Sequence, residues 1–423
     1  MKVIVQKYGG SSVSTVQNLR NVAKRVIQCK QQGYAVVAVV SAMGDSTDDL
    51  LALARELSSD PSRRELDALM ATGEIVSMSL LAIAIHEMGT KAVALNGFQC
   101  GIFTNDVHSN ARILEVRPER IQDHLMQDEI VVVAGFQGFS SKGDFTTLGR
   151  GGSDTSAVAL AAALNADHCE IYTDVPGVFS ADPRLVPQAR YLEELNAVEM
   201  QELAWTGAKV LKAEAVEFAS TNALPIVVRS TFEDGHDTVI HPGRDSRAIF
   251  RPRRPEVAGV SGRKDVIRII ADWAAFSGAV GEEIFEVIAR YDLVLAVAGS
   301  PTEPVDILIS NLEMPDPVAF ARELRRRFAG SVTVADELGV ISLVGFGLGS
   351  RPGAFFAAST LLRDAGIPVA RTFTTRESLS FVVPCSRVDE GVVLMHRAFV
   401  EACDAESIVA ATHSRNERRE ITA

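Results

Sequence analysis

The stretch TTLGRGGSDTSA, Thr146 to Ala157, carries the signals from which the fold of this chain is predicted. Glycines stand on both sides of Arg150, and Ser153 and Asp154 then lead into the apolar segment AVALAAAL. Ser and Asp are common helix N-cap residues, so we predict that a helix begins at these positions. A helix N-terminus attracts anions, and an arginine binds phosphate or carboxylate through two parallel hydrogen bonds. The stretch therefore predicts an anion-binding site; a Gly-rich turn that only caps a helix is the alternative.

The composition indicates a soluble globular protein of two or three domains, since 423 residues exceed what one core holds. A net charge of −12 disfavours nonspecific nucleic-acid binding, so an anionic substrate needs locally placed basic residues. Five scattered cysteines without CxxC spacing predict neither a disulfide framework nor a zinc site. No uninterrupted apolar run approaches a membrane span, and the N-terminus lacks a signal-peptide pattern. We expect a cytoplasmic protein that binds neither nucleic acid nor membranes.

The N-terminal segment reads as a strand, a Gly-rich turn and a helix. VIVQKY is followed by Gly9 and Gly10, and an apolar stripe of helical spacing then continues to Gly33. This order suits a phosphate-binding turn with Lys7 at the end of the strand. It is not a Walker A loop, because the lysine precedes the glycines and no GxxxxGKS or GxxxxGKT occurs. A plain tight turn is the alternative.

The next strand is predicted over residues 35–40, where a continuous apolar run is typical of a parallel strand buried on both faces. The polar loop predicted from Ser41 to Asp49 lies at the strand end where open α/β sheets bind ligands. Ser41, Thr47 and Asp48 are its candidate ligand-binding residues, and a solvated loop is the alternative. Further on, Glu74 follows Gly73 at the expected head of a very apolar helix. A carboxylate there either complements the helix dipole or binds a substrate ammonium group, and the sequence leaves both possibilities open.

The remaining strands alternate with helices, which predicts a mostly parallel sheet covered on both faces. GFQGFSSKGDFTTLG is expected to form a hairpin that leads the chain to Gly149. In EIYTDVPGVFSADPR, turn residues with an Asp and an Arg suit the rim of a nucleotide site, with a surface loop as the alternative. HPGRDSRAIFRPRRPEV then marks a domain boundary. Beyond it, a repeat of roughly 75 residues reads twice as strand, helix, strand, strand, helix.

Seven motifs in this order resemble the bacterial aspartokinases of the amino-acid kinase superfamily: VQKYGGSSV, SAMGDSTDD, ATGE, AGFQGF, TTLGRGGSDTSA, EIYTDVPGVFSADPR and GAKVL. The resemblance implies an α/β amino-acid kinase fold, a mostly parallel sheet with helices on both faces, followed by two α+β ACT domains. The expected limits are 1–245 for the catalytic domain, 246–262 for a linker, 263–335 and 336–410 for the ACT domains, and 411–423 for a flexible tail.

The same resemblance implies an activity and a set of site residues. The reaction would transfer the γ-phosphoryl group of MgATP to the β-carboxylate of L-aspartate, giving 4-phospho-L-aspartate for lysine, threonine and methionine synthesis. Lys7 and Asp154 would act at the transferring group. The residues implied to surround aspartate are Ser41, Thr47, Glu74, Arg150, Gly151, Gly152 and Ser153. The residues implied to line the ATP site are Lys7, Gly9, Gly10, Thr173, Asp174, Phe179, Asp182, Arg184 and Lys209.

The chemistry implied is one of positioning and charge neutralisation. A β-carboxylate with a pKa of about 4 is already ionised at neutral pH, so no strong general base is needed. Lys7 and Mg²⁺ would neutralise the phosphoryl oxygens, with the Mg²⁺ carried by the nucleotide and no metal site of the protein's own. Arg150 would hold the α-carboxylate of aspartate and Glu74 its ammonium group.

The repeat region departs from the family pattern for lysine or threonine binding. An Asp-x-Pro-Gly turn and a Gln-Asn pair are usual there, whereas this chain reads ADWAAFSG and VAGSP, with Gly299 and Ser300 near the amide-pair position. Either the ACT pair is a dimerisation scaffold with weakened feedback, which we favour, or it binds another effector. A catalytically weak amino-acid-sensing ACT protein is the alternative function; it would be expected to have lost Lys7, Arg150 or Asp154, and all three are present.

Overall fold

The computed structural model describes residues 1–58, 60–208, 210–233, 235–243, 257–289, 294–300, 302–311, 314 and 317–402. The described residues form two compact units. The first unit comprises those within 1–178, 192–201 and 209–244, and the second those within 179–191, 202–208 and 245–423.

The first unit is built on an eight-stranded sheet, ordered β12-β14-β13-β9-β1-β2-β6-β3. All neighbouring strands for which a register is resolved are parallel, except that β13 and β14 are antiparallel. β2 and β6 are fully or largely buried, as their runs of Val and Ala predict. The strands are β1 (Lys2–Tyr8), β2 (Tyr34–Val40), β3 (Ala92–Leu95), β6 (Ile130–Ala134), β9 (His168–Thr173), β12 (Glu194–Asn196), β13 (Ile226–Ser230) and β14 (Asp237–His241).

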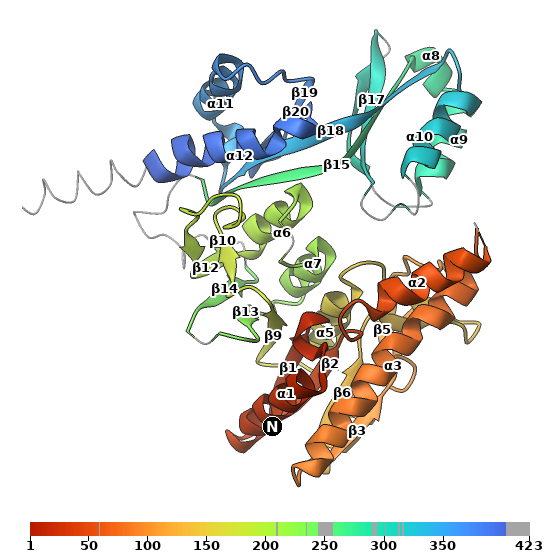
Figure 1. Ribbon diagram of the computed structural model, residues 1–423, viewed down its shortest axis with the longest axis vertical. Helices are drawn as coiled ribbons and strands as arrows, with labels where there is room; N and C mark the ends of the chain where they lie inside the picture. The colour runs from red at the N-terminus through yellow and green to blue at the C-terminus, as the bar shows by residue number, and fades with distance from the viewer. Residues whose placement is uncertain are drawn as a thin grey trace, which may run out of the picture. The chain divides into compact units, whose positions relative to one another are not determined.

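Helices cover this sheet on both faces. On one face α1 and α3 run side by side over β1, β2 and β6 (Figure 1), where Leu19, Val26, Leu81 and Ile85 share a core with the strands. On the other face α5 packs against β1, β2 and β9 and against α7. The helices are α1 (Val16–Gln31), α2 (Ser46–Leu57), α3 (Arg63–Glu87), α4 (Glu119–Met126), α5 (Gly152–Ala163), α6 (Ala197–Thr206), which continues into the second unit, and α7 (Ala213–Thr221).

Helix α3 is the longest helix of the described chain, with 25 residues. By length and composition alone it is able to cross a membrane, with a mean hydropathy of 1.9 in its most apolar window. Half of that window is buried within the protein, and core helices of soluble proteins have the same composition. Small and polar residues interrupt its apolar positions, so no single apolar run in the sequence indicated this length.

A smaller sheet of four strands, ordered β5-β4-β7-β8, completes the first unit. β7 and β8 form the antiparallel hairpin expected from the sequence, with Gln137 opposite Thr147. β8 ends at Thr147, directly before the Gly-rich stretch, so this sheet fixes where that stretch begins. The strands are β4 (Ile102–Thr104), β5 (Ile113–Val116), β7 (Gln137–Phe139) and β8 (Phe145–Thr147).

The second unit has a six-stranded sheet, ordered β16-β17-β15-β18-β20-β19, in which every pair is antiparallel. β15 and β18 are long central strands that run through both halves of the sheet (Figure 1). The strands are β15 (Gly259–Ala271), β16 (Val294–Ser300), β17 (Glu303–Ser310), β18 (Val332–Val344), β19 (Arg371–Thr374) and β20 (Ser378–Pro384).

Two helical layers give this sheet two cores. Ile284 of α9 and Leu324 of α10 pack on β15 and β17, whereas Leu362 of α11 and Val392 of α12 pack on β18 and β20. In Figure 1 each pair of helices lies at its own end of the sheet. The helices are α8 (Trp273–Phe276), α9 (Ala279–Ala289), α10 (Pro317–Arg327), α11 (Pro352–Asp364) and α12 (Val388–His396).

The segment 179–191 belongs to the second of these cores. Its ends pair as the short strands β10 (Val178–Phe179) and β11 (Tyr191–Leu192), and Ala181 and Val186 are buried among α12 and β18 side chains. Ser180 Oγ lies 2.9 Å from Nε2 of the fully buried His396, whose Nδ1 lies 3.0 Å from Glu401 Oε1. The segment is therefore held by apolar packing and by the series of polar contacts from Ser180 through His396 to Glu401.

The expected fold class, an amino-acid kinase fold followed by two α+β units, is confirmed. The tandem repeat is present as two sets of strand, helix, strand, strand and helix. β15 begins at Gly259, inside the stretch expected to be a linker, because its first residues pair with the end of β18. The domain limits given above stay predictions, and the expected tail at 411–423 lies outside the described residues.

Candidate active site

The candidate site lies at the carboxyl edge of the eight-stranded sheet. Lys7 of β1 stands between Val39 of β2 and Ile171 of β9 in the parallel register. Gly9 and Gly10, Ser41 and Thr173 close or follow these three adjacent strands and so meet at one edge. Gly9 N donates to Tyr172 O and Ser41 N donates to Tyr8 O, which continues the sheet pairing to this edge.

Lys7 and Asp154 form the central ion pair of the site. Lys7 Nζ lies 2.6 Å from Asp154 Oδ1, and the two side chains are 12% and 8% exposed. Alternation along β1 points Lys7 to the face covered by α5, and Asp154 stands in the first turn of that helix. Because both side chains are largely shielded from water, the ion pair holds Lys7 in a defined position. At the N-terminus of α5, the Lys7 ammonium group can also attract a phosphoryl oxygen.

The Gly-rich stretch begins α5 differently from the sequence expectation. Gly151, with φ of 71°, is the N-cap residue and the helix starts at Gly152, so Ser153 and Asp154 lie inside the first turn rather than at the cap. The left-handed conformation required at Gly151 suits glycine and explains the shift. A Cβ on Gly152 would lie 2.7 Å from Leu148 Cβ, so the backbone there approaches its neighbour too closely for a side chain.

Two further contacts support this helix start. Ser153 is buried against Gly135, where a Cβ would come within 2.9 Å of Ser153 Cβ. Lys212 packs its stem against Gly151, and its Nζ donates to Leu148 O at 3.0 Å. Sequence reasoning missed Lys212 and selected Lys209, which lies outside the described residues. The only feature of the sequence that could have indicated Lys212 is that it is a second lysine, directly after GAKVL.

Glu74 lies in the middle of α3, not at a helix head, because the helix runs from Arg63 through Gly73 without a break. The dipole explanation for this carboxylate is therefore wrong. Glu74 is buried; Oε1 accepts a hydrogen bond of 3.1 Å from Ala42 N, and Oε2 has no hydrogen-bond partner within the described chain. Burial raises the pKa of Glu74 to about 7, against the opposing effect of the Ala42 hydrogen bond.

The loop after β2 packs closely on α3 and on the Gly9–Gly10 turn. A Cβ on Gly73 would lie 2.8 Å from Ala42 Cβ and 3.9 Å from Thr47 Oγ1. A Cβ on Gly10 would lie 3.0 Å from the carbonyl oxygens of Ala42 and Gly44. The glycines thus allow three backbone segments to meet beside Glu74 and Thr47.

Arg150 and Asp174 are exposed charged residues at this edge. The side chain of Arg150 is 68% exposed, and its guanidinium lies 3.9 Å from Asp48, the neighbour of Thr47. Thr173 Oγ1 donates to Asp174 Oδ1 at 3.0 Å where β9 ends. The accessible guanidinium of Arg150 and the buried carboxylate of Glu74 match the two charged ends of an amino acid in their chemistry.

Three of the remaining predicted nucleotide residues do not belong to the first unit, and the fourth, Lys209, lies outside the described residues. Phe179, Asp182 and Arg184 belong to the second unit, where Phe179 makes an edge contact with Tyr191. Arg184 bonds Asp182 through its backbone and guanidinium nitrogens. Among the residues that the structure describes, no three His, Cys, Asp or Glu side chains form a group able to hold a metal ion.

This fold and site have known relatives. The model of the Amino acid kinase family matches residues 2–230, more than half of the sequence. The chain therefore belongs to the amino acid kinase family. Within it, the chain groups with aspartokinases: it is 40% identical over 420 residues to the aspartokinase of Mycolicibacterium smegmatis, covering 97% of this chain and 99% of the relative. The aspartokinase of Geobacillus stearothermophilus is 40% identical over 414 residues, covering 96% and 100%.

Solved structures agree with this grouping. Aspartate kinase from Synechocystis is 34% identical, with a TM-score of 0.54 over 94% of this chain and 69% of that one. Aspartokinase III of E. coli, solved in complex with aspartate and ADP, has a TM-score of 0.79 over 93% of this chain and 99% of that one. At 23% identity the second likeness supports the fold alone.

Proposed function

We propose that this protein is an aspartate kinase that transfers the γ-phosphoryl group of ATP to the β-carboxylate of L-aspartate. The observation that carries the proposal is Glu74, a buried carboxylate with one oxygen unpartnered among the described residues, in the same site as the Lys7–Asp154 pair. A substrate ammonium group would satisfy that oxygen and repay the cost of burying the charge. The aspartokinase relatives favour aspartate as the amino acid.

In the proposed mechanism, binding and charge neutralisation do the work. Glu74 holds the ammonium group and Arg150 the α-carboxylate, so that the β-carboxylate attacks the γ-phosphorus in line. Gly151, Gly152 and Ser153, with Ser41 and Thr47, shape the pocket around the amino acid. Lys7 neutralises charge on the transferring phosphoryl oxygens, and Asp154 fixes the position of Lys7 rather than accepting a proton.

ATP is proposed to lie along the rim, with Gly9 and Gly10 at its phosphates and Thr173 and Asp174 beside it. The resemblance also implies that Phe179, Asp182, Arg184 and Lys209 bind the nucleotide, and this stays a prediction. Mg²⁺ would arrive with the nucleotide, since a Mg²⁺ that keeps water and phosphate ligands needs only one or two carboxylates, which Asp154 or Asp174 offers. It would supply charge neutralisation of the phosphates. We further propose a cytoplasmic homo-oligomer formed through the ACT pair.

The test is ATP-dependent aspartyl hydroxamate formation by the full chain. We expect Lys7→Ala to lower kcat about 100-fold or more, the usual effect of removing one preorganised charge from a transition state. Lys2→Ala is the matched control, because Lys2 is an exposed lysine of the same strand. Near-normal turnover of Lys7→Ala with weakened ATP affinity alone would remove the neutralising role from Lys7. A wild-type protein without aspartate-dependent activity would favour the amino-acid-sensing alternative.

A further inference from the structure

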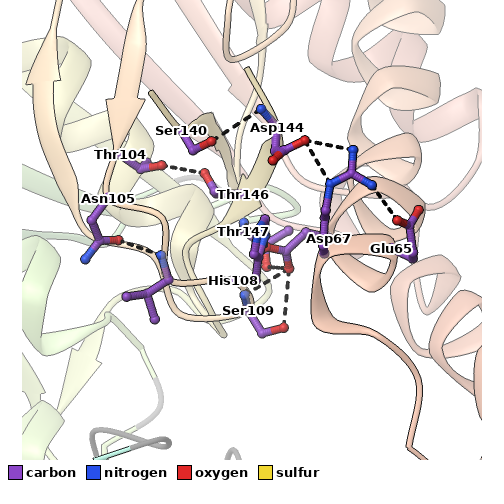
Figure 2. Close-up of polar contacts among 12 residues, drawn as sticks. Glu65, Asp67, Thr104, Asn105, His108, Ser109, Ser140, Asp144, Thr146 and Thr147 are labelled. Carbon is purple, nitrogen blue, oxygen red and sulfur yellow. Dashed lines mark hydrogen bonds and ion pairs between the residues drawn. The ribbon is translucent and has the colours of Figure 1, made fainter. Parts of the chain in front are cut away.

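We infer that Asp67 is a positioning residue for aspartate recognition. It holds β8, the strand that precedes Arg150, against α3, the helix that contains Glu74. This inference rests on the proposed function. Figure 2 shows the carboxylate of Asp67 on α3 at the centre of a polar cluster with His108, Ser109 and Thr147. No motif of the sequence singled out this residue.

Asp67 is a fully buried carboxylate whose hydrogen-bonding capacity is used within the protein. Thr147 donates to it twice, through Oγ1 at 2.7 Å and through its backbone N at 3.2 Å. Ser109 N lies 3.0 Å from both carboxylate oxygens, and Ser109 Oγ lies 3.4 Å from Oδ1. His108 Nδ1 lies 2.9 Å from Oδ2. A carboxamide at this position would offer one acceptor oxygen in place of two, so it could not accept all of these hydrogen bonds.

The geometry of Ser109 indicates that the cluster holds its surroundings firmly. Ser109 has a φ of 69°, a left-handed conformation that is unfavourable for a serine. Such strain persists only where the surrounding contacts over-determine it. Here the Ser109 backbone N–H is held by both oxygens of Asp67.

The position of Asp67 connects the two groups proposed to bind aspartate. Glu74 follows Asp67 by seven residues on α3, about two helical turns along the same side. Thr147 is the last residue of β8, and Arg150 follows three residues later. Gln137 Nε2 also donates to Ala71 O at 3.0 Å, which ties β7 to the same part of α3. Asp67 therefore sets the distance between the ammonium and carboxylate anchors.

The test compares two substrates that differ only at the α-carboxylate: L-aspartate and its α-amide, which retains the ammonium group and the β-carboxylate. If Asp67 positions Arg150, Asp67→Asn lowers kcat/KM for aspartate about tenfold or more, the scale of a small misplacement. The α-amide lacks the group that Arg150 holds, so its kcat/KM falls much less, and the KM for ATP stays near that of the wild type. Discrimination between the substrates thus collapses in the variant.

Two further variants separate positioning from loss of structure. Thr147→Val removes one of the hydrogen bonds to Asp67 and is expected to reduce discrimination partially, which provides a readout if Asp67→Asn fails to fold. Thr104→Val is the matched control: it removes the buried Thr104–Thr146 hydrogen bond of 2.6 Å in the same sheet without touching Asp67. It is expected to lower stability and leave discrimination unchanged.

The outcomes are distinguishable. Equal losses on both substrates in Asp67→Asn and Thr147→Val, or discrimination that falls as much in Thr104→Val, would overturn the positioning role. Unchanged kinetics in Asp67→Asn would overturn it as well. A wild-type protein that forms no hydroxamate from aspartate would instead overturn the proposed function itself.

Discussion

At the scale of single residues, Glu74 lowers the stability of the folded protein and is proposed to bind the ammonium group of the substrate. Its carboxylate is buried with one backbone donor, and burial raises its pKa to about 7. The unfolded chain has a pKa near 4.5 for this group. Folding therefore favours the protonated form, and the ionised form costs stability. This penalty is absent below about pH 4.5, grows as the pH rises, and is complete above about pH 7.

We predict that Glu74→Gln stabilises the protein at pH 8 and removes aspartate binding. The gain is on the order of 3 kcal/mol, since a tenfold change in proton affinity corresponds to about 1.4 kcal/mol. At pH 4.5 most of the gain disappears, because Glu74 is then neutral in the folded state and about half protonated in the unfolded chain. The KM for aspartate should rise at least about tenfold, as expected for loss of a hydrogen bond to a charged group. Urea unfolding at both pH values and hydroxamate kinetics measure the two effects.

Glu65→Gln is the matched control, because Glu65 is an exposed acid on the same helix. It should change neither the stability difference between the two pH values nor the KM for aspartate. Glu74→Gln that is equally destabilising at both pH values would show that the carboxylate contributes structural hydrogen bonds instead. In the wild type, the KM for aspartate should also rise as the pH falls below about 7.

How far the sequence predicts this site depends on the kind of residue. Lys7, Glu74 and Arg150 could be selected because each is a charged residue next to or near a glycine, although the helix end expected at Glu74 was wrong. Asp67 and Lys212 could not be found in this way. Their partners, Thr147 and Leu148, are more than sixty residues away in sequence, and an Asp or a Lys on a helix is usually a solvated side chain.

At the scale of elements, the contact between α3 and the loop after β2 sets the depth of the candidate site. Gly73 lets Ala42 approach the helix, and Ala42 N in turn binds Glu74. The sequence indicated both elements, yet it placed the helix head beside Gly73. A glycine usually interrupts a helical pattern, whereas here close packing requires it. The start of α5 was displaced for a similar reason, since the left-handed Gly151 takes the cap position.

We predict that Gly73→Ala destabilises the first unit and weakens aspartate binding. The added Cβ would lie 2.8 Å from Ala42 Cβ, and such overpacking typically costs about 1–3 kcal/mol. The better helix propensity of alanine offsets up to about 1 kcal/mol of this cost. Displacement of Ala42 and of Thr47, which stands at the start of α2, should raise the KM for aspartate. Equilibrium urea unfolding and substrate kinetics give both readouts.

Gly353→Ala provides the control, because Gly353 is also helical but has open space around its Cβ position. This variant should be neutral or stabilised by up to about 1 kcal/mol. If both alanine variants unfolded at the same urea concentration as the wild type, the close approach at Gly73 would make no contribution to the free energy of unfolding.

At the scale of the whole molecule, the chain crosses between its two units several times. The sequence repeat correctly indicated the tandem α+β arrangement, because a repeated order of strand and helix patterns can be recognised in one sequence. It could not indicate that the segment 179–191 packs in the second unit. That placement depends on Ala181 and Val186 joining a core and on the Ser180–His396 contact, which are long-range pairings with no local signature.

The second unit also bears on regulation. Gly299 and Ser300 stand on β16 where the family pattern would place an amide pair. A Cβ on Gly299 would lie 2.9 Å from Val305 Cα, so close packing against β17 leaves no room for a side chain there. Ser300 Oγ lies 3.1 Å from Thr302 Oγ1 and is engaged locally. The position therefore presents neither of the amide groups that would grip an amino-acid effector.

We predict that aspartate kinase activity is indifferent to millimolar lysine, threonine or both together. Because a ligand that binds only the folded state raises the unfolding temperature, neither amino acid should shift thermal unfolding of the full chain. Hydroxamate kinetics and thermal unfolding thus test the same claim independently. Loss of activity with either amino acid, accompanied by a thermal shift, would show that another part of the second unit forms the effector pocket. A thermal shift without inhibition would separate binding from feedback and leave the ACT pair as a scaffold that has kept its ligand but lost its coupling to the kinase.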